Sequence, residues 1–217
     1  MLRRFTAPGA SINTGSYESH TVPIRNGRSA QETFSTDVQG FEILPHSSAV
    51  ADFTDKAEVD AVYLPEVIAF IKERTGADEV VTRGAVLRRS VSPAEHASQP
   101  QAALVHIDYG PQGADMTAAR VYAEQFPDGP VDRIPDDPLA EVDESKMITS
   151  GSEFVYSPDH VWWYFPDMTR EEILFFVFHD SDHSRAWRVL HSAFRDPTVE
   201  DAVPRHSIGV RSFAFFS

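Results

Sequence analysis

The amino-acid sequence predicts a mainly β protein of the α+β class, with a double-stranded β-helix core (jelly roll, cupin-like) and one or two flanking helices. A helical region comes first, several strand-like segments follow it, and no regular alternation of helices with strands occurs. The length of 217 residues fits a single domain over 1–217.

The N-terminal part of the chain, residues 1–40, carries many Ser, Thr, Gly and Asn side chains and few aliphatic ones. We therefore expect it to wrap over the surface, with a short edge strand at 21–24. The change from polar to apolar sequence at 40–44 predicts the first strand of the core. The helices and the jelly-roll core are expected to occupy residues 41–217.

Residues 52–75 have the pattern of a helical region. Val67, Ile68 and Ile71 recur at helical spacing and predict its buried face. Its start and stop signals are Thr54 or Asp55 as the capping residue, Pro65 in the first turn of a second helix, and Gly76 at the C-terminal end.

From Glu79 onward the apolar residues recur with a period close to two, which is typical of half-buried strands. The expected strands are 79–87, 103–109, 119–125, 153–157, 161–165, 172–179, 187–192 and 207–216. The turn-forming sequence between them shows no regular helical period, which favours a β-sandwich or jelly roll over a parallel sheet.

Composition excludes several classes of protein. The chain has 33 Asp and Glu against 19 Lys and Arg, so nucleic acids and anionic membranes are not expected partners. It has no cysteine, which excludes disulfides, thiolate nucleophiles and thiolate metal sites. No apolar run matches a membrane span or a signal peptide, so we expect a soluble, cytoplasmic protein.

His106 and Asp108 form an H-x-D pair in a strand-like run that ends before Gly110. Alternate residues of a strand point to the same face, so both side chains face one way. His191 ends another strand-like run and is the candidate for a third ligand. Two imidazoles and one carboxylate leave the opposite face of a metal open, as in non-haem Fe(II) oxygenases. These three residues are therefore the predicted metal ligands and catalytic residues.

Other histidines compete with His191. His179 and His183 flank Asp180 and Asp182, a cluster that could bind a cation, although a polar solvated turn is the ordinary interpretation of Asp-Ser-Asp. The remaining candidates lie in polar or irregular sequence, where exposed histidine is common; they are His20, His46, His96 and His160.

Arg205 and Ser207 open the last predicted strand. A guanidinium fork with a nearby hydroxyl matches a carboxylate, so these residues are candidates to anchor the distal carboxylate of 2-oxoglutarate. An ion pair of Arg205 with a surface carboxylate is the alternative in a chain this acidic.

Aromatic side chains are frequent in the runs 162–165 and 175–178. Most of them are expected in the core, because alternating aromatic positions bury large areas between sheets. Tyr109, Tyr122 and Trp163 are the candidates for lining a substrate pocket.

Several segments, in order along the chain, resemble one family. They are 39–42, 63–66, 105–109 (Val-His-Ile-Asp-Tyr), 160–168, 180–182 (Asp-Ser-Asp), 191–197 and 204–211. Over residues 20–217 the chain resembles the AsaB/CmcJ-type hydroxylase/desaturase family, with relatives in gibberellin desaturation and in fungal and bacterial secondary metabolism. It departs from the family in one segment, where Ala123, Gln125 and Phe126 replace polar or aromatic residues.

The resemblance implies a double-stranded β-helix oxygenase that uses Fe(II), 2-oxoglutarate and O2. By position it implies His106, Asp108 and His191 as iron ligands, and Arg205 with Ser207 as the cosubstrate anchor. The expected reaction is hydroxylation, desaturation or oxidative cyclisation of a small metabolite. Two alternatives stay open: a cupin-like metal-dependent dioxygenase or isomerase that does not use 2-oxoglutarate, and a non-catalytic small-ligand binding protein with structural histidines.

Overall fold

The structure, a computed structural model, describes residues 4–7, 10–12, 17–89, 104–129, 152–194, 196, 198–199 and 205–217. Within these residues the chain has few helices and many short strands, as predicted. It divides into two compact units. The first comprises Met1–Ser47, Leu104–Ala114 and Asp143–Ser192, and the second Ser48–Ala103, Asp115–Val142 and Ala193–Ser217. The single domain over 1–217 stays a prediction.

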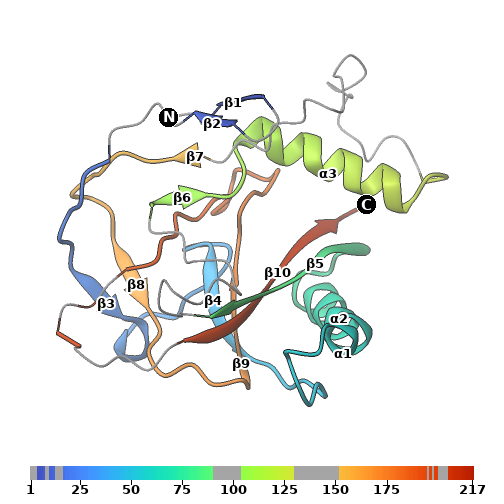
Figure 1. Cartoon of the computed structure of the whole chain (residues 1–217), viewed down its shortest axis with the longest axis horizontal. Coiled ribbons are helices and arrows are strands. Elements are labelled where there is room, and N and C mark those ends of the chain that lie inside the picture. Colours follow the sequence, from blue (N-terminus) through green and yellow to red (C-terminus); the bar gives the residue numbers. More distant parts are fainter. Residues whose placement is uncertain are drawn as a thin grey trace. The chain divides into compact units, whose positions relative to one another are not determined.

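The first unit contains short strand pairs, most of which join segments far apart in the sequence (Figure 1). The parallel pair is β3 (Ile24–Asn26) with β8 (Trp162–Tyr164). The antiparallel pairs are β4 (Phe41–Pro45) with β9 (Glu172–Phe176), β6 (His106–Ile107) with β7 (Ser152–Glu153), and β1 (Arg4–Ala7) with β2 (Ala10–Ile12).

Aromatic side chains hold two of these pairs together. The buried Phe34 ring lies 5.0 Å from Phe41 on β4, 5.0 Å from Trp163 on β8 and 5.5 Å from Phe165, as centroid distances. Such edge and offset contacts add to the stabilisation that buried area provides. The cluster therefore forms an aromatic core for the first unit, as predicted for run 162–165.

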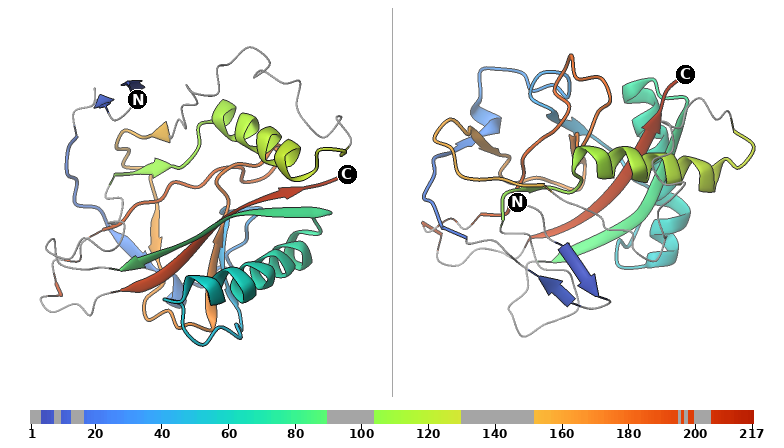
Figure 2. Two further views of the ribbon diagram at one scale, coloured as in Figure 1. Left: turned by 45° about the vertical axis from the view of Figure 1, so that its right-hand side comes forward. Right: turned by 90° about the horizontal axis from the view of Figure 1, so that it is seen from above.

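The second unit is built on one long antiparallel pair, β5 (Glu79–Arg89) with β10 (His206–Phe215). Helix α1 (Lys56–Glu58), the π-helical turn Val59–Tyr63 and helix α2 (Leu64–Thr75) follow one another without a break. Helix α2 packs against β5, and Figure 2 shows both helices along this strand pair. The helical region predicted at 52–75 is confirmed.

The predicted helix boundaries also agree with the structure. The Asp55 side chain accepts hydrogen bonds from the Ala57 and Glu58 amides, so it is the capping residue. Pro65 stands in the first turn of α2, and Gly76 ends that helix with a left-handed φ of 73°.

The strand predicted at 119–125 is wrong, because these residues belong to helix α3 (Pro111–Gln125). Ala114, Thr117 and Val121 are buried at helical spacing, and Pro111 occupies the first turn. Ala119 and Val121 alternate as in a strand, but the helical spacing of the buried residues and the high helix propensity of alanine favour a helix.

Several other predicted strands are shorter than expected or displaced; those at 103–109, 161–165 and 172–179 reduce to β6, β8 and β9. The prediction at 153–157 reduces to Ser152–Glu153, and the following Phe154, Val155 and Tyr156 are exposed. The prediction at 187–192 reduces to an isolated bridge at His191, and the edge strand at 21–24 falls at β3 instead. Side chains before Tyr17, within the predicted wrapping segment, lie outside the described residues. Among the described helices, none has the length and apolar character to cross a membrane.

Candidate metal centre

The candidate metal centre lies in the first unit and is built on the backbone of β6. The His106 amide donates to the His191 carbonyl at 3.1 Å, and the His191 amide donates to the His106 carbonyl at 3.0 Å. On its other side His106 stands opposite Glu153 of β7. This pairing places His106 between His191 and Glu153, so that these side chains share one face of a small antiparallel sheet.

Three ligand-type side chains converge on this face. Asp108 Oδ1 lies 3.4 Å from His106 Nε2 and 3.9 Å from His191 Nε2, and all three ligand atoms lie within 4.8 Å of one another. A divalent metal with bonds of about 2.1 Å would space adjacent ligand atoms by roughly 3 Å. The side chains are 20 to 27 % exposed. The donor set, its spacing and its access to solvent therefore fit a metal ion.

The hydrogen bonds of the two imidazole rings orient them for metal binding. His106 Nδ1 lies 2.7 Å from the Leu104 carbonyl, and His191 Nδ1 lies 3.4 Å from the Val189 carbonyl. A carbonyl oxygen only accepts, so each Nδ1 carries the proton when the ring is neutral. Each Nε2 lone pair then faces Asp108. This tautomer, with the proton on Nδ1, is the one that a metal bound at Nε2 requires.

Nearby charge favours a cation at this position. Asp108 raises the pKa of His106, chiefly through their hydrogen bond, and Glu153 adds to this through its negative charge. Glu153 also accepts a hydrogen bond from the Tyr17 hydroxyl at 2.9 Å. Glu153 does not stand out in the sequence, because its place beside His106 depends on the pairing of β6 with β7, for which no local pattern exists.

Aromatic rings pack against His191, the third candidate ligand. The Phe176 and Phe178 rings lie 5.3 Å and 5.5 Å from the His191 ring, as centroid distances. The Val189 amide also donates to the Val177 carbonyl at 3.0 Å, which ties the segment before His191 to the end of β9. The position of His191 is therefore fixed both by its ring contacts and by its backbone.

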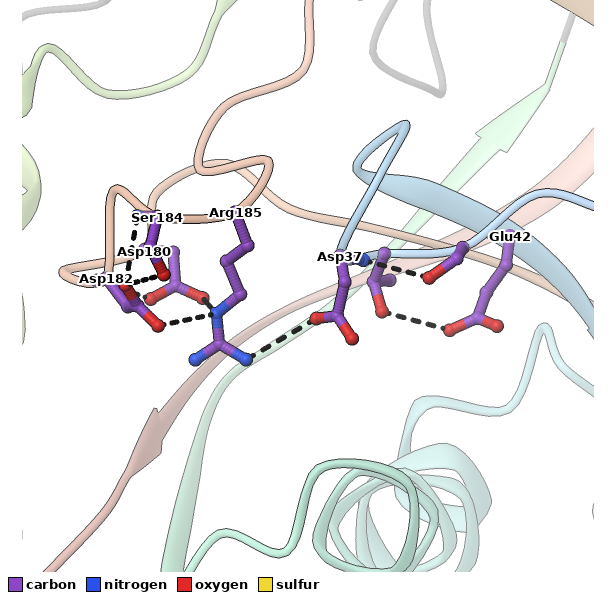
Figure 3. Close-up of polar contacts among 8 residues, drawn as sticks. Asp37, Glu42, Asp180, Asp182, Ser184 and Arg185 are labelled. Carbon is purple, nitrogen blue, oxygen red and sulfur yellow. Dashed lines mark hydrogen bonds and ion pairs between the residues drawn. The ribbon is translucent and has the colours of Figure 1, made fainter.

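The competing cluster around His179 and His183 forms a different structure. Arg185 Nε lies 3.1 Å from Asp180 and 3.5 Å from Asp182, and its Nη1 lies 3.4 Å from Asp37 (Figure 3). The two aspartates are therefore held by a guanidinium. Among the described residues, the one group of at least three side chains placed to hold a metal ion is His106, Asp108 and His191.

The other predicted site residues lie elsewhere. Arg205 is exposed just before β10, and Ser207 stands opposite Arg88 on β5, both in the second unit. Tyr122 is buried in the core of that unit, 4.9 Å from the Phe215 ring. In the first unit, Tyr109 is buried, and Trp163 lies in the aromatic core.

Comparison with known proteins identifies the family. The family model described as "Oxidoreductase/YMDC permease-like domain" matches residues 3–135 and 139–215. The hydroxylase/desaturase asaB of Aspergillus flavus is 30 % identical, over 92 % of this chain and 82 % of that protein. The chain belongs to the hydroxylase/desaturase family. It is an oxidoreductase of that family, which confirms the predicted resemblance.

Further relatives carry names that state their chemistry. The alpha-ketoglutarate-dependent dioxygenase phiK of a fungal species is 28 % identical, over 89 % of this chain and 83 % of its own length. The solved structure of the iron and alpha-ketoglutarate-dependent endoperoxidase NvfI superposes with a TM-score of 0.76 at 22 % identity, covering 99 % of this chain and 93 % of that one. The chain therefore has the fold of that endoperoxidase.

Proposed function

We propose that the protein is an Fe(II)/2-oxoglutarate-dependent oxygenase that oxidises a small metabolite of secondary metabolism by hydroxylation, desaturation or oxidative cyclisation. The observation that carries the proposal is the convergence of His106, Asp108 and His191, with both Nδ1 atoms turned to backbone carbonyls. The names of the relatives phiK and asaB support the cosubstrate and the reaction class.

In this proposal His106 and His191 would hold Fe(II) through Nε2, and Asp108 would hold it through Oδ1. Three protein ligands would leave room on the metal for 2-oxoglutarate and O2. The iron and cosubstrate, when bound, would supply the oxidation by O2. The chain holds the three ligand atoms in place, and because a carboxylate is one of them, the position that a halide would need in a halogenase is taken.

Arg205 and Ser207 are proposed to hold the distal carboxylate of 2-oxoglutarate. Arg205 is exposed, and none of the ion pairs within the part of the chain that the structure describes involves it, so its guanidinium is accessible to a ligand. An arginine fork with a hydroxyl beside it suits a carboxylate.

The double-stranded β-helix is proposed as the arrangement of the strands. The antiparallel pairs β4 with β9, β5 with β10 and β6 with β7 each join segments far apart in sequence, as a jelly roll requires. The likeness in fold to the endoperoxidase supports this assignment.

The experiment that tests the function is an anaerobic titration with Fe(II) and then 2-oxoglutarate, followed by visible absorption. A charge-transfer band that forms in the wild type, weakens in Arg205→Ala and persists in Arg83→Ala supports the proposal. Arg83 is a suitable control because its exposed guanidinium faces Glu124 at 3.3 Å. If Fe(II) binds but no charge-transfer band forms, 2-oxoglutarate is not the cosubstrate, and a cupin-like metal enzyme is favoured. Absence of Fe(II) binding would favour a non-catalytic binding protein.

A further inference from the structure

Arg188 joins the segments that carry the metal ligands. Its Nη2 donates to the Tyr109 carbonyl at 3.2 Å and to the Ser152 hydroxyl at 2.8 Å. Tyr109 directly follows Asp108, Ser152 belongs to β7, and Arg188 itself precedes His191 by three residues. One guanidinium therefore connects three chain segments that meet at this sheet.

The register of the strands explains this position. The isolated bridge between His106 and His191 is antiparallel, and extending its register by three residues would bring Tyr109 opposite Arg188. The described β6 ends at Ile107, before this point is reached. The Arg188 side chain thus bonds to a carbonyl that lies just beyond the end of the β6 strand.

Arg188 lies behind the ligands. Ser152, its second acceptor, stands opposite Ile107 in the register, and Ile107 alternates with His106 and Asp108 along the strand. The guanidinium therefore bonds on the reverse face of the sheet. It can fix the positions of Asp108 and His191 without entering the space where a metal would bind.

The surroundings of Arg188 are unusual for a surface arginine. Its Nε is buried without a hydrogen-bond partner, and no carboxylate lies within ion-pair distance of it among the described residues. Its guanidinium carbon lies 5.8 Å from the Phe154 ring centroid and 5.0 Å from that of Trp187. Burial lowers the pKa of Arg188. Removing part of the solvent from a cation costs free energy, and the two hydrogen bonds of Arg188 offset part of that cost. They therefore differ from the weak contacts of a fully solvated surface arginine.

We propose that Arg188 is a positioning residue of the metal centre, which sets the distance between Asp108 and His191 by holding the Tyr109 carbonyl and Ser152 from behind. The inference rests on the proposed metal site. Arg185 offers a matched comparison, because it lies in the same segment but joins the aspartates Asp37, Asp180 and Asp182. Arg185 therefore serves as the control for the general effect of losing an arginine from this segment.

The test is a Co(II) titration of the metal-free protein, followed by the visible d–d spectrum, with thermal unfolding of each variant measured in parallel. Arg188→Lys keeps the charge, but the lysine side chain ends one atom short of Nη2, the nitrogen that donates to both acceptors. We expect its Kd for Co(II) to rise about 10- to 100-fold, with an altered d–d band, as for other outer partners of metal ligands. Arg185→Gln should keep the wild-type Kd and spectrum.

Ser152→Ala removes one acceptor without altering the cation, so it keeps the inference testable if Arg188→Lys fails to fold. It should raise the Kd by a smaller factor and leave the metal-free Tm near that of the wild type. Wild-type Kd and d–d spectrum in either variant would overturn the role of Arg188 while leaving the metal centre intact. Failure of the wild-type protein to bind Co(II) would overturn the metal centre itself.

Discussion

His106 and His191 are joined by two reciprocal backbone hydrogen bonds, of 3.1 Å and 3.0 Å, so the two histidines proposed as ligands belong to one antiparallel bridge. Their rings lie 4.2 Å apart, as centroids, on the same face. The backbone therefore sets the spacing of the imidazoles before any metal binds. This makes the site preorganised: a metal ion does not have to gather its ligands from separate loops.

Each of the three ligands should be needed for metal binding. His106→Ala, Asp108→Ala and His191→Ala are each expected to weaken Co(II) or Fe(II) affinity by more than about 100-fold, since loss of an outer partner alone costs about 10- to 100-fold. Isothermal titration under anaerobic conditions measures this. His160→Ala is the control, because His160 lies in a turn against Trp162. Near wild-type affinity in any ligand variant would remove that residue from the site.

Gly40 should be needed to hold the segment before His191. Its φ is +82°, and a Cβ added there would overlap the Val189 side chain. At Gly76, where φ is +73°, an added Cβ meets nothing within 4 Å. Gly76→Ala should therefore lower the free energy of unfolding by only about 1–2 kcal/mol, for the left-handed backbone. Gly40→Ala should lower it by the same amount and by about 1–3 kcal/mol more for overpacking.

Urea unfolding of the two glycine variants checks this difference. Because Val189 also accepts from the His191 ring through its carbonyl, Gly40→Ala should weaken metal binding as well. Gly76→Ala should leave metal affinity unchanged, since Gly76 lies in the second unit. Equal destabilisation by both substitutions would show that Val189 moves aside at little cost.

Much of the site was predictable because its signals are local. The H-x-D pair is read from strand alternation, and the capping Asp55 and the terminal Gly76 act within one turn of their helices. His191 was predicted from its place at the end of an apolar run and from the resemblance. Its contact with His106 is a long-range pairing, which the structure supplies.

The parts that could not be predicted depend on tertiary pairing or on competing local patterns. Glu153 joins the metal face only through the pairing of β7 with β6. Arg188 and Arg185 look alike in sequence, and only their contacts separate a residue behind the metal centre from one among aspartates. The strand predicted at 119–125 is wrong because Val121 fits both a strand period and a helical one, and the residues form helix α3.

Acid should weaken the first unit through Glu172. Both Arg28 Nη atoms donate to its carboxylate, at 2.9 Å and 2.7 Å, and with the Thr169 amide they lower the pKa of Glu172 to about 2. A lowered carboxyl pKa stabilises the fold above the unfolded value of about 4.3. This contribution is lost as the pH falls from there through about 2.

Glu172→Gln measures that contribution. We expect the variant to be less stable than the wild type at pH 7, and the gap in free energy of unfolding to narrow at pH 3. Glu171→Gln is the control, because Glu171 is largely exposed and its nearest arginine nitrogen is 3.9 Å away. A gap of the same size at both pH values would mean that the ionised Glu172 does not stabilise the fold.

Ile107 should couple stability to metal binding. It lies between the proposed ligands His106 and Asp108, faces the opposite side of the sheet and is 2 % exposed. Ile107→Ala is expected to cost about 2–5 kcal/mol in urea unfolding, because the cavity lies behind a two-residue strand with few ways to collapse. Val155→Ala, at an 88 % exposed side chain, should change stability by less than about 0.5 kcal/mol. If packing of Ile107 holds β6 in place, metal affinity falls in Ile107→Ala and not in Val155→Ala. A loss of stability with unchanged metal affinity would show that the backbone bridge to His191 is enough to hold the proposed ligands.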